Sequence, residues 1–60
     1  MMDKDNFDKL PMGRKNWLIT EKGKYLGVRE YYNHYINLYL VDDEFIEVWY
    51  FPAENRIEKI

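Results

Sequence analysis

Side chains able to carry out nucleophilic or acid–base chemistry are few in this chain. It has no cysteine and no serine, Thr20 is its one aliphatic hydroxyl, and His34 is its one imidazole. A serine or cysteine nucleophile paired with a histidine base therefore cannot be assembled. Zinc sites built from cysteines or from several histidines are excluded for the same reason. The three glycines are isolated and form no phosphate-binding loop. We therefore expect no enzymatic activity and no bound cofactor or metal.

The acidic run Asp42, Asp43 and Glu44 is the cluster that could attract a hard cation, because such ions prefer carboxylate oxygens. It lacks the alternate spacing and the central glycine of a calcium-binding loop, so a solvated turn is the better interpretation. The composition is compatible with paired carboxylates for glycoside hydrolysis, but so small a chain offers little cleft for a sugar. His34 lies at an expected turn and is interpreted as a solvated histidine. We keep Asp42, Asp43 and Glu44 as a candidate acidic patch for a partner.

The composition favours binding rather than catalysis. Aromatic residues make up 18% of the chain, as six Tyr, three Phe and two Trp. Each ring can bury about 150–250 Å². Sixty residues form one domain at most, and a domain of this size is short of apolar core. The rings therefore either complete that core or contact a partner.

From residue 16 onward, short runs of strand-forming residues are separated by turn-forming residues, a pattern that indicates antiparallel strands. We expect strands at residues 17–20, 25–31, 35–41, 45–51 and 56–60, with turns at 21–24, at Asn33, at 42–44 and at 52–55. Gly23 and Asn33 suit turn positions that need positive φ. A helical turn is the alternative for residues 56–60. The predicted fold is mainly β, a small antiparallel meander of four to five strands, either open or curled into an SH3-like or other small barrel.

Residues 1–15 are the least β-like part of the chain, and we expect an N-terminal arm or a short helix there. Asp3 can cap such a helix, Phe7 and Leu10 would share one of its faces, and Pro11 and Gly13 would end it. The chain is thus divided into an arm, residues 1–15, and an antiparallel β-domain, residues 16–60.

Directly opposed residues of a hairpin share a face, so loop length decides which side chains lie together. Three-residue loops at 32–34 and 42–44 would place Val28 opposite Leu38 and Leu38 opposite Val48. One face would then be aliphatic, with Ile36, Leu38, Leu40, Ile46, Val48 and Tyr50. The other would be largely aromatic, with Arg29, Tyr31, Tyr35, Asn37, Tyr39, Phe45, Glu47, Trp49 and Phe51.

This aromatic face has four interpretations. The N-terminal segment could cover it as a lid, with Phe7, Leu10, Met12 and Trp17 facing the sheet. It could bind another protein or a second copy of the chain, because Tyr, Trp and Arg are frequent interface hot spots. Its rings could stack on bases of single-stranded nucleic acid or on a sugar. Glu47 would repel phosphates, and could instead pair with Arg29 or with a basic group of a partner. The candidate partner-binding residues are Arg29, Tyr31, Tyr35, Tyr39, Phe45, Glu47, Trp49 and Phe51.

The net charge of −2 conceals an uneven distribution along the chain. Residues 1–30 carry seven Lys and Arg against five Asp and Glu, whereas residues 31–60 carry two against six. We expect two solvated faces that attract each other within the fold. The weak basic excess is poor support for nucleic-acid binding, while the acidic half could occupy a basic groove on a partner protein.

Residues 1–12 contain no apolar segment of the kind found in signal peptides, and no apolar run is long enough to span a bilayer. We therefore expect a cytoplasmic protein, encoded by a host or by a phage, with no membrane partner. The predicted role is a non-enzymatic interaction module, regulator or inhibitor that binds a protein through the aromatic face or the acidic turn. The alternative is a small β-domain that binds single-stranded nucleic acid.

Overall fold

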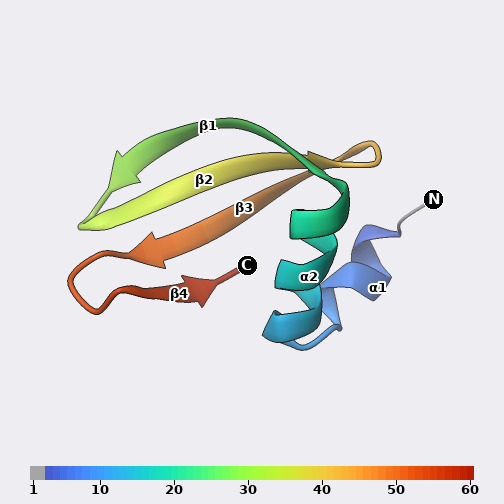
Figure 1. Cartoon of the computed structure of the whole chain (residues 1–60), viewed down its shortest axis with the longest axis horizontal. Helices are drawn as coiled ribbons and strands as arrows, with labels where there is room; N and C mark the ends of the chain where they lie inside the picture. The colour runs from blue at the N-terminus through green and yellow to red at the C-terminus, as the bar shows by residue number, and fades with distance from the viewer. Residues whose placement is uncertain (1–2) are drawn as a thin grey trace.

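Two short helices precede a four-stranded antiparallel sheet in the computed structural model, which describes residues 3–60 (Figure 1). The elements in chain order are helices α1 (Lys4–Asp8) and α2 (Met12–Lys22) and strands β1 (Gly23–Tyr31), β2 (His34–Val41), β3 (Glu44–Phe51) and β4 (Arg56–Lys59). Each strand pairs with the next along the chain, in the order β1-β2-β3-β4. The predicted mainly β meander is confirmed, and the sheet stays open rather than closing into a barrel.

Helix α1 confirms the short helix predicted near the N-terminus. The Asp3 carboxylate caps it by accepting a hydrogen bond from the amide of Asp5 at 3.1 Å. This pairs one of the amide donors that the first turn of a helix leaves unsatisfied. Phe7 is the buried residue of α1. Pro11 separates the two helices, and its carbonyl accepts from the amide of Arg14 in the first turn of α2 at 3.0 Å.

The strand predicted at residues 17–20 is wrong, because this segment forms the middle of α2. Ile19 is buried and Leu18 is partly buried, while Trp17 and Thr20 on either side of them are exposed. Two neighbouring residues facing inward between two facing outward follow the helical period and not the alternation of a strand. A run of four residues is too short to distinguish the two periods from sequence. The expected boundary after residue 15 also falls inside α2.

The turn predicted at residues 21–24 is wrong as well. Gly23 donates its amide to the Ile19 carbonyl at the end of α2, and it begins β1 with an extended backbone, φ −79° and ψ 142°. A Cβ at this position would lie 2.4 Å from the Ile19 carbonyl oxygen. Glycine is therefore required here by a close approach of the backbone, and not by the positive φ that was expected.

The two central hairpins have two-residue loops at 32–33 and 42–43, instead of the predicted three-residue loops. Tyr32 and Asn33 both have positive φ, 45° and 64°, as a type I′ turn requires, so a turn at Asn33 is confirmed. Leu38 lies opposite Glu47 rather than Val48. Because a shift of one residue moves every side chain of a strand to the other face, the predicted aliphatic and aromatic faces are wrong as sets.

The core lies on one face of the sheet, between the strands and the two helices. Phe7 of α1 and Ile19 of α2 pack there against Val41, Ile46 and Val48, which are all buried. Partly buried side chains surround this cluster, namely Leu10, Leu18, Tyr39, Ile57 and Ile60. We call this side the covered face and define it on the central strands by Tyr35, Asn37, Tyr39, Val41, Ile46, Val48 and Tyr50.

The N-terminal segment does cover the sheet, but not the face predicted for the lid. Phe7 and Leu10 join the core, whereas Met12 and Trp17 are exposed. Both helices lie near one end of the sheet, on the side of the β2–β3 turn (Figure 1). The opposite end, which carries the β1–β2 and β3–β4 turns, extends beyond them.

Strand β4 confirms the strand predicted in the last residues rather than the helical turn. Within residues 3–60 it pairs with the second half of β3 alone, from Trp49 to Phe51. Asn55, with φ 50°, closes the turn before it, as the tolerance of Asn for left-handed backbone predicts. The first half of β3 is bordered instead by a hollow between α1 and the end of the chain.

Candidate interaction surface

The second face of the sheet lies away from the core and carries most of the candidate functional residues. Cross-strand pairing aligns Arg29, Ile36 and Trp49 on this face, and Leu38 with Glu47. Alternation along each strand adds the remaining members. We call it the open face and define it by Arg29, Tyr31, His34, Ile36, Leu38, Leu40, Phe45, Glu47, Trp49 and Phe51.

The structure brings most of the predicted partner-binding residues together but separates two of them from the rest. Tyr35 and Tyr39 were assigned to the same face and lie on the covered face, opposite Tyr50 and Ile46, because the hairpin loop is one residue shorter than predicted. Tyr39 packs against the core. The residues that do share the open face are Arg29, Tyr31, Phe45, Glu47, Trp49 and Phe51.

Arg29 and Glu47 form an ion pair across the middle of the open face. Arg29 Nη1 lies 2.9 Å from Glu47 Oε2, although Arg29 is on β1 and Glu47 is on β3, with β2 between them. The Trp49 indole N–H also donates to this carboxylate, at 3.4 Å. The Arg29 guanidinium, with a smaller effect from Trp49, holds the pKa of Glu47 below its usual range. The pairing with Arg29 anticipated from the sequence is thus confirmed.

Ile36 is buried beneath these side chains, with 1% of its surface exposed. It does not belong to the cluster that the helices form with the covered face. Its neighbours on the adjacent strands are Arg29 and Trp49. The open face therefore has a small apolar centre of its own, which side chains of the sheet itself enclose.

Trp49 is held in place by contacts on several sides. Tyr31 and His34 meet its ring in T-shaped arrangements, with centroid separations of 5.8 Å and 5.7 Å. The Lys59 ammonium lies 4.0 Å from the ring centroid, as a cation–π contact. A ligand that stacked on this side of the indole would have to displace Lys59, whereas a partner that touches the outer rings would not.

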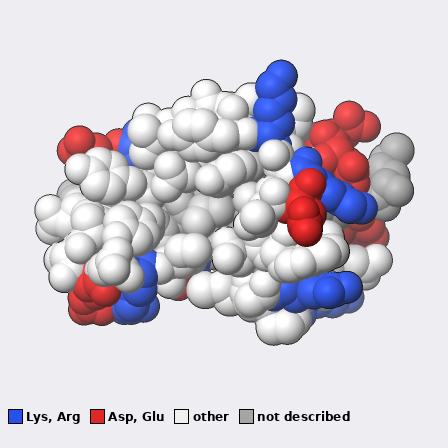
Figure 2. All heavy atoms as spheres, in the orientation of Figure 1, with Lys and Arg blue, Asp and Glu red and all other residues white. Residues whose placement is uncertain are grey.

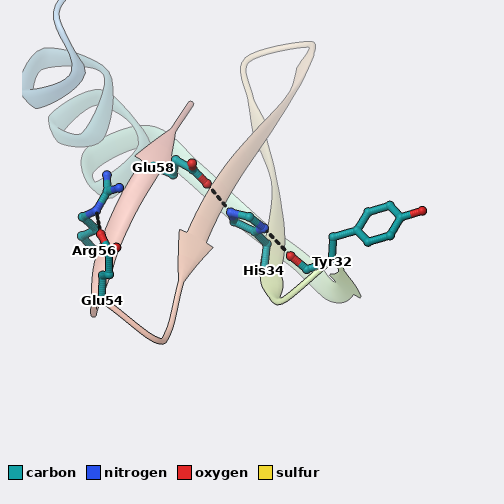
Figure 3. A network of polar contacts seen from close by, with 5 residues as sticks. All are labelled: Tyr32, His34, Glu54, Arg56 and Glu58. Atoms are coloured by element: carbon teal, nitrogen blue, oxygen red, sulfur yellow. Dashed lines mark hydrogen bonds and ion pairs between the residues drawn. The ribbon is translucent and has the colours of Figure 1, made fainter.

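His34 connects the β1–β2 turn to β4 (Figure 3). Its Nδ1 lies 2.7 Å from the Tyr32 carbonyl oxygen, and its Nε2 contacts the Glu58 carboxylate. Both partners are acceptors, so the arrangement is satisfied when both ring nitrogens carry protons. The Tyr32 carbonyl, aided by Glu58, outweighs partial burial and raises the pKa of His34. The ring also stacks on Phe51 at a centroid separation of 5.0 Å.

The interpretation of His34 as a solvated turn histidine is wrong, since it begins β2 and its side chain is only 18% exposed. A signal was available, because His34 has the same parity along its strand as Ile36 and Leu38. Sequence reasoning also missed Glu58 and Lys59. They lie beside a shift of register between β3 and β4, and no residue pattern in the sequence predicts that shift.

Two rings at opposite ends of the open face are the most exposed of its aromatic members. Phe45, near the β2–β3 turn, has 61% of its surface exposed, and Tyr31, near the β1–β2 turn, has 50%. Beside Phe45 lies a hollow of about 450 Å³, whose walls include Lys4, Asp8 and Ile60. The open face therefore combines projecting rings with a neighbouring concave region.

The acidic patch lies next to Phe45. Asp42 and Asp43 form the β2–β3 turn, and Glu44 is the first residue of β3. Within residues 3–60, no three His, Cys, Asp or Glu side chains are grouped so that they could hold a metal ion. In the view of Figure 2 the charged side chains gather toward the ends and edges and leave a broad uncharged area between them. The participation of the acidic patch in binding stays a prediction.

Comparisons of the chain with protein-family models, with curated proteins and with solved structures gave no match. In the part of the chain that the structure describes, neither helix has the length and apolar character needed to cross a bilayer.

Proposed function

We propose that the protein is a non-enzymatic interaction module, a small regulator or inhibitor, that binds a protein partner through the open face. The placement of the helices is the observation that carries the proposal. Both helices pack on the covered face, while the open face keeps Phe45 and Tyr31 largely in contact with solvent. Large apolar groups gathered on an exposed, rigid surface are typical of binding sites.

Three neighbouring residues of the open face are of the types that dominate binding energy in protein complexes, namely Trp49, Tyr31 and Arg29. Trp49 contacts Tyr31, and Arg29 is aligned with Trp49 across β2. Contacts with His34 and Lys59 already restrict the Trp49 ring. A partner that binds here therefore loses little free energy to the ordering of side chains.

The charges around Phe45 indicate the chemistry of the partner. Arg29 and Glu47 neutralise each other inside the open face, so its centre suits an apolar or aromatic contact. Asp42 and Asp43 lie at the adjacent turn. A partner seated on Phe45 would meet these carboxylates at the border of the contact. We therefore propose a partner surface with an apolar patch bordered by Lys or Arg side chains.

Single-stranded nucleic acid is the second candidate ligand, and one observation favours it. Lys59 and Arg29 lie among the rings of Tyr31 and Trp49, and rings flanked by cations are the usual platform for unpaired bases. The carboxylates of Glu47 and Glu58 share this region and would repel phosphates. We rank this candidate below a protein partner for that reason.

The test of the protein-binding proposal compares quantitative capture from the native host by three exposed-ring variants. Phe45→Ala and Tyr31→Ala remove rings from the open face, and Trp17→Ala removes an exposed ring from α2 as the matched control. We expect a specific partner to be kept by Trp17→Ala and lost by the other two, with circular dichroism and melting temperature preserved. Capture that survives both open-face variants would overturn the proposal.

The nucleic-acid candidate is tested by fluorescence anisotropy with labelled single-stranded oligonucleotides at two salt concentrations. Binding through phosphates weakens steeply as salt rises. Salt-dependent binding that Lys59→Met abolishes would establish the second candidate in place of the first. Absence of such binding near neutral pH would remove it.

A further inference from the structure

Strand β1 is a long exposed edge of the sheet. Among the described residues it pairs with β2 alone, and it forms the outer border of the sheet in Figure 1. It has nine residues, and the side chains of Leu26 and Val28 on it are exposed. Every second residue along such an edge has backbone N–H and C=O groups that are unpaired within the sheet, which makes the edge a template for another strand. This edge is therefore suited to bind an extended chain segment through backbone hydrogen bonds.

Two irregularities limit the part of β1 that can accept a strand. The register with β2 shifts between Tyr25 and Gly27, which marks a β-bulge, and a bulge interrupts the regular spacing of backbone groups. At the other end the chain turns at residues 32–33. The regular edge is therefore the five residues 27–31.

Hairpin geometry identifies which residues of this segment can bond outward. Tyr31 and His34 flank a two-residue loop, so they form a hydrogen-bonded pair with each other. Hydrogen-bonded and non-hydrogen-bonded pairs alternate along an antiparallel ladder. Counting back from Tyr31 leaves Val28 and Glu30 with their backbone groups directed away from β2.

We propose that residues 27–31 pair antiparallel with the same residues of a second copy of this chain, about a two-fold axis at Arg29. In this antiparallel register all five regular residues are paired, and the backbone groups of Val28 and Glu30 form the hydrogen bonds between the two copies. It sets Val28 opposite Glu30 of the second copy, and Glu30 opposite Val28 of the second copy. Registers centred one residue to either side would draw the bulge or the β1–β2 turn into the ladder.

The side chains of this register are compatible with self-pairing. Gly27 lies opposite Tyr31 of the second copy, and nothing lies within 4 Å of the place where a Gly27 Cβ would be. Gly27 therefore offers no side chain that would collide with the second copy, and the Tyr31 ring leans over β2 toward Trp49, away from the edge. The two Arg29 residues meet at the axis, but each guanidinium reaches over β2 to Glu47, away from the edge.

The proposed dimer has a defined shape and size. Two-fold edge pairing joins like faces, so the open faces of both copies would form one continuous surface, with the helices of both copies on the other side. The edge at β4 has only four residues, a register shift and charged side chains, so it resists further pairing and the assembly closes at two copies. Five paired residues bury little area, and we expect weak association. The β1 edge can pair in this way whatever the open face binds.

Sedimentation equilibrium on the full chain and on charge variants at position 28 tests the dimer and its register. Val28 is exposed, so replacing it should leave the fold intact. Val28→Lys places Lys opposite Glu30 of the second copy twice in the dimer, whereas Val28→Glu places like charges there. Opposite charges that face each other in a strand pair attract, and like charges repel. We therefore expect the dimer dissociation constant to be lower than that of the parent chain for Val28→Lys and higher for Val28→Glu, by roughly two- to thirtyfold in each case.

The double variant V28E/E30K restores opposite charges and should recover the association that Val28→Glu loses. Circular dichroism and melting temperature report whether each variant is folded. A chain that remains monomeric from about 10 µM to about 1 mM overturns the proposal. Association that responds equally to Val28→Lys and Val28→Glu, or that Phe45→Ala abolishes, places the contact elsewhere and also overturns it.

Discussion

The guanidinium of Arg29 and the carboxylate of Glu47 meet at 2.9 Å above strand β2, although they arise from the strands on either side of it. Beneath them Ile36 is buried on a face that the helices do not cover. A polar bridge thus forms part of the cover that a helix or a second sheet would otherwise supply. This explains how so short a chain can leave one face of its sheet open and still bury an isoleucine there.

The Arg29–Glu47 bridge should contribute measurably but modestly to stability. In a double-mutant cycle with Arg29→Met and Glu47→Gln, we expect a coupling of about 0.2–1 kcal/mol, because both side chains are about half exposed and solvent screens the pair. The coupling should fall as salt is added. Urea unfolding of the four proteins measures it, and a coupling of zero at low salt would contradict the structure.

The pH dependence of this bridge has a defined sign. Arg29 lowers the pKa of Glu47, so the stabilisation is present above the pKa of an unfolded glutamate, about 4.3, and is lost as pH falls through the lower folded value. The stability difference between the parent chain and Glu47→Gln should therefore shrink below about pH 4. A difference that grows on acidification would contradict the assignment.

Ile36 should behave as a core residue despite its position on the open face. It is 1% exposed, so Ile36→Ala is expected to cost about 2–5 kcal/mol of unfolding free energy through lost burial and a cavity. Phe45→Ala on the same face removes a larger but exposed side chain and should change stability by less than about 0.5 kcal/mol. Equal effects of the two substitutions in urea unfolding would show that Ile36 is not enclosed.

Gly13 inside α2 and Gly23 directly after it should respond to alanine in opposite directions. Gly13 lies in α2 with open space around a Cβ, so Gly13→Ala should stabilise the protein by up to about 1 kcal/mol. At Gly23 the new Cβ would lie 2.4 Å from the Ile19 carbonyl oxygen, and we expect a loss of more than about 1 kcal/mol. Thermal unfolding measures both, and a gain at Gly23 would contradict the close approach.

The meander could be predicted because residues 35–41 and 45–51 are rich in β-branched and aromatic side chains and are bounded by turn-forming residues. The register could not be predicted, because neither two-residue loop contains the glycine that usually marks a loop of this length. Tyr32 and Asp42 adopt positive φ without it, at 45° and 53°. One residue of loop length then decided whether Tyr35 and Tyr39 faced the core or the open face.

Candidate binding residues could be found from residue type, but their supporting partners could not. Trp49 and Arg29 were identified because aromatic and basic residues are common at interfaces. Lys59, which lies on the Trp49 ring, enters the site from β4 through an irregular pairing with β3. Only tertiary structure brings these side chains together.

His34 should make the stability of the protein depend on pH around neutrality. The carbonyl of Tyr32 and the carboxylate of Glu58 raise its pKa, so the folded state favours the imidazolium. The resulting stabilisation is fully present below the pKa of an unfolded histidine, about 6.5, and is lost as pH rises through the higher folded value. His34→Gln should therefore lower the melting temperature more at about pH 5.5 than at about pH 8.5.

His34 is the one histidine of the chain, so its ring signals in an NMR titration can be assigned without ambiguity. We expect a midpoint above about 6.5 in the parent chain. Glu58→Gln removes the acceptor charge at Nε2 and keeps a side chain of similar size, so it should lower the midpoint and reduce the pH dependence of the melting temperature. Because the Tyr32 carbonyl remains, some elevation should persist. A midpoint in the parent chain at or below that of an unfolded histidine would show that the bridge between the β1–β2 turn and β4 does not form in solution.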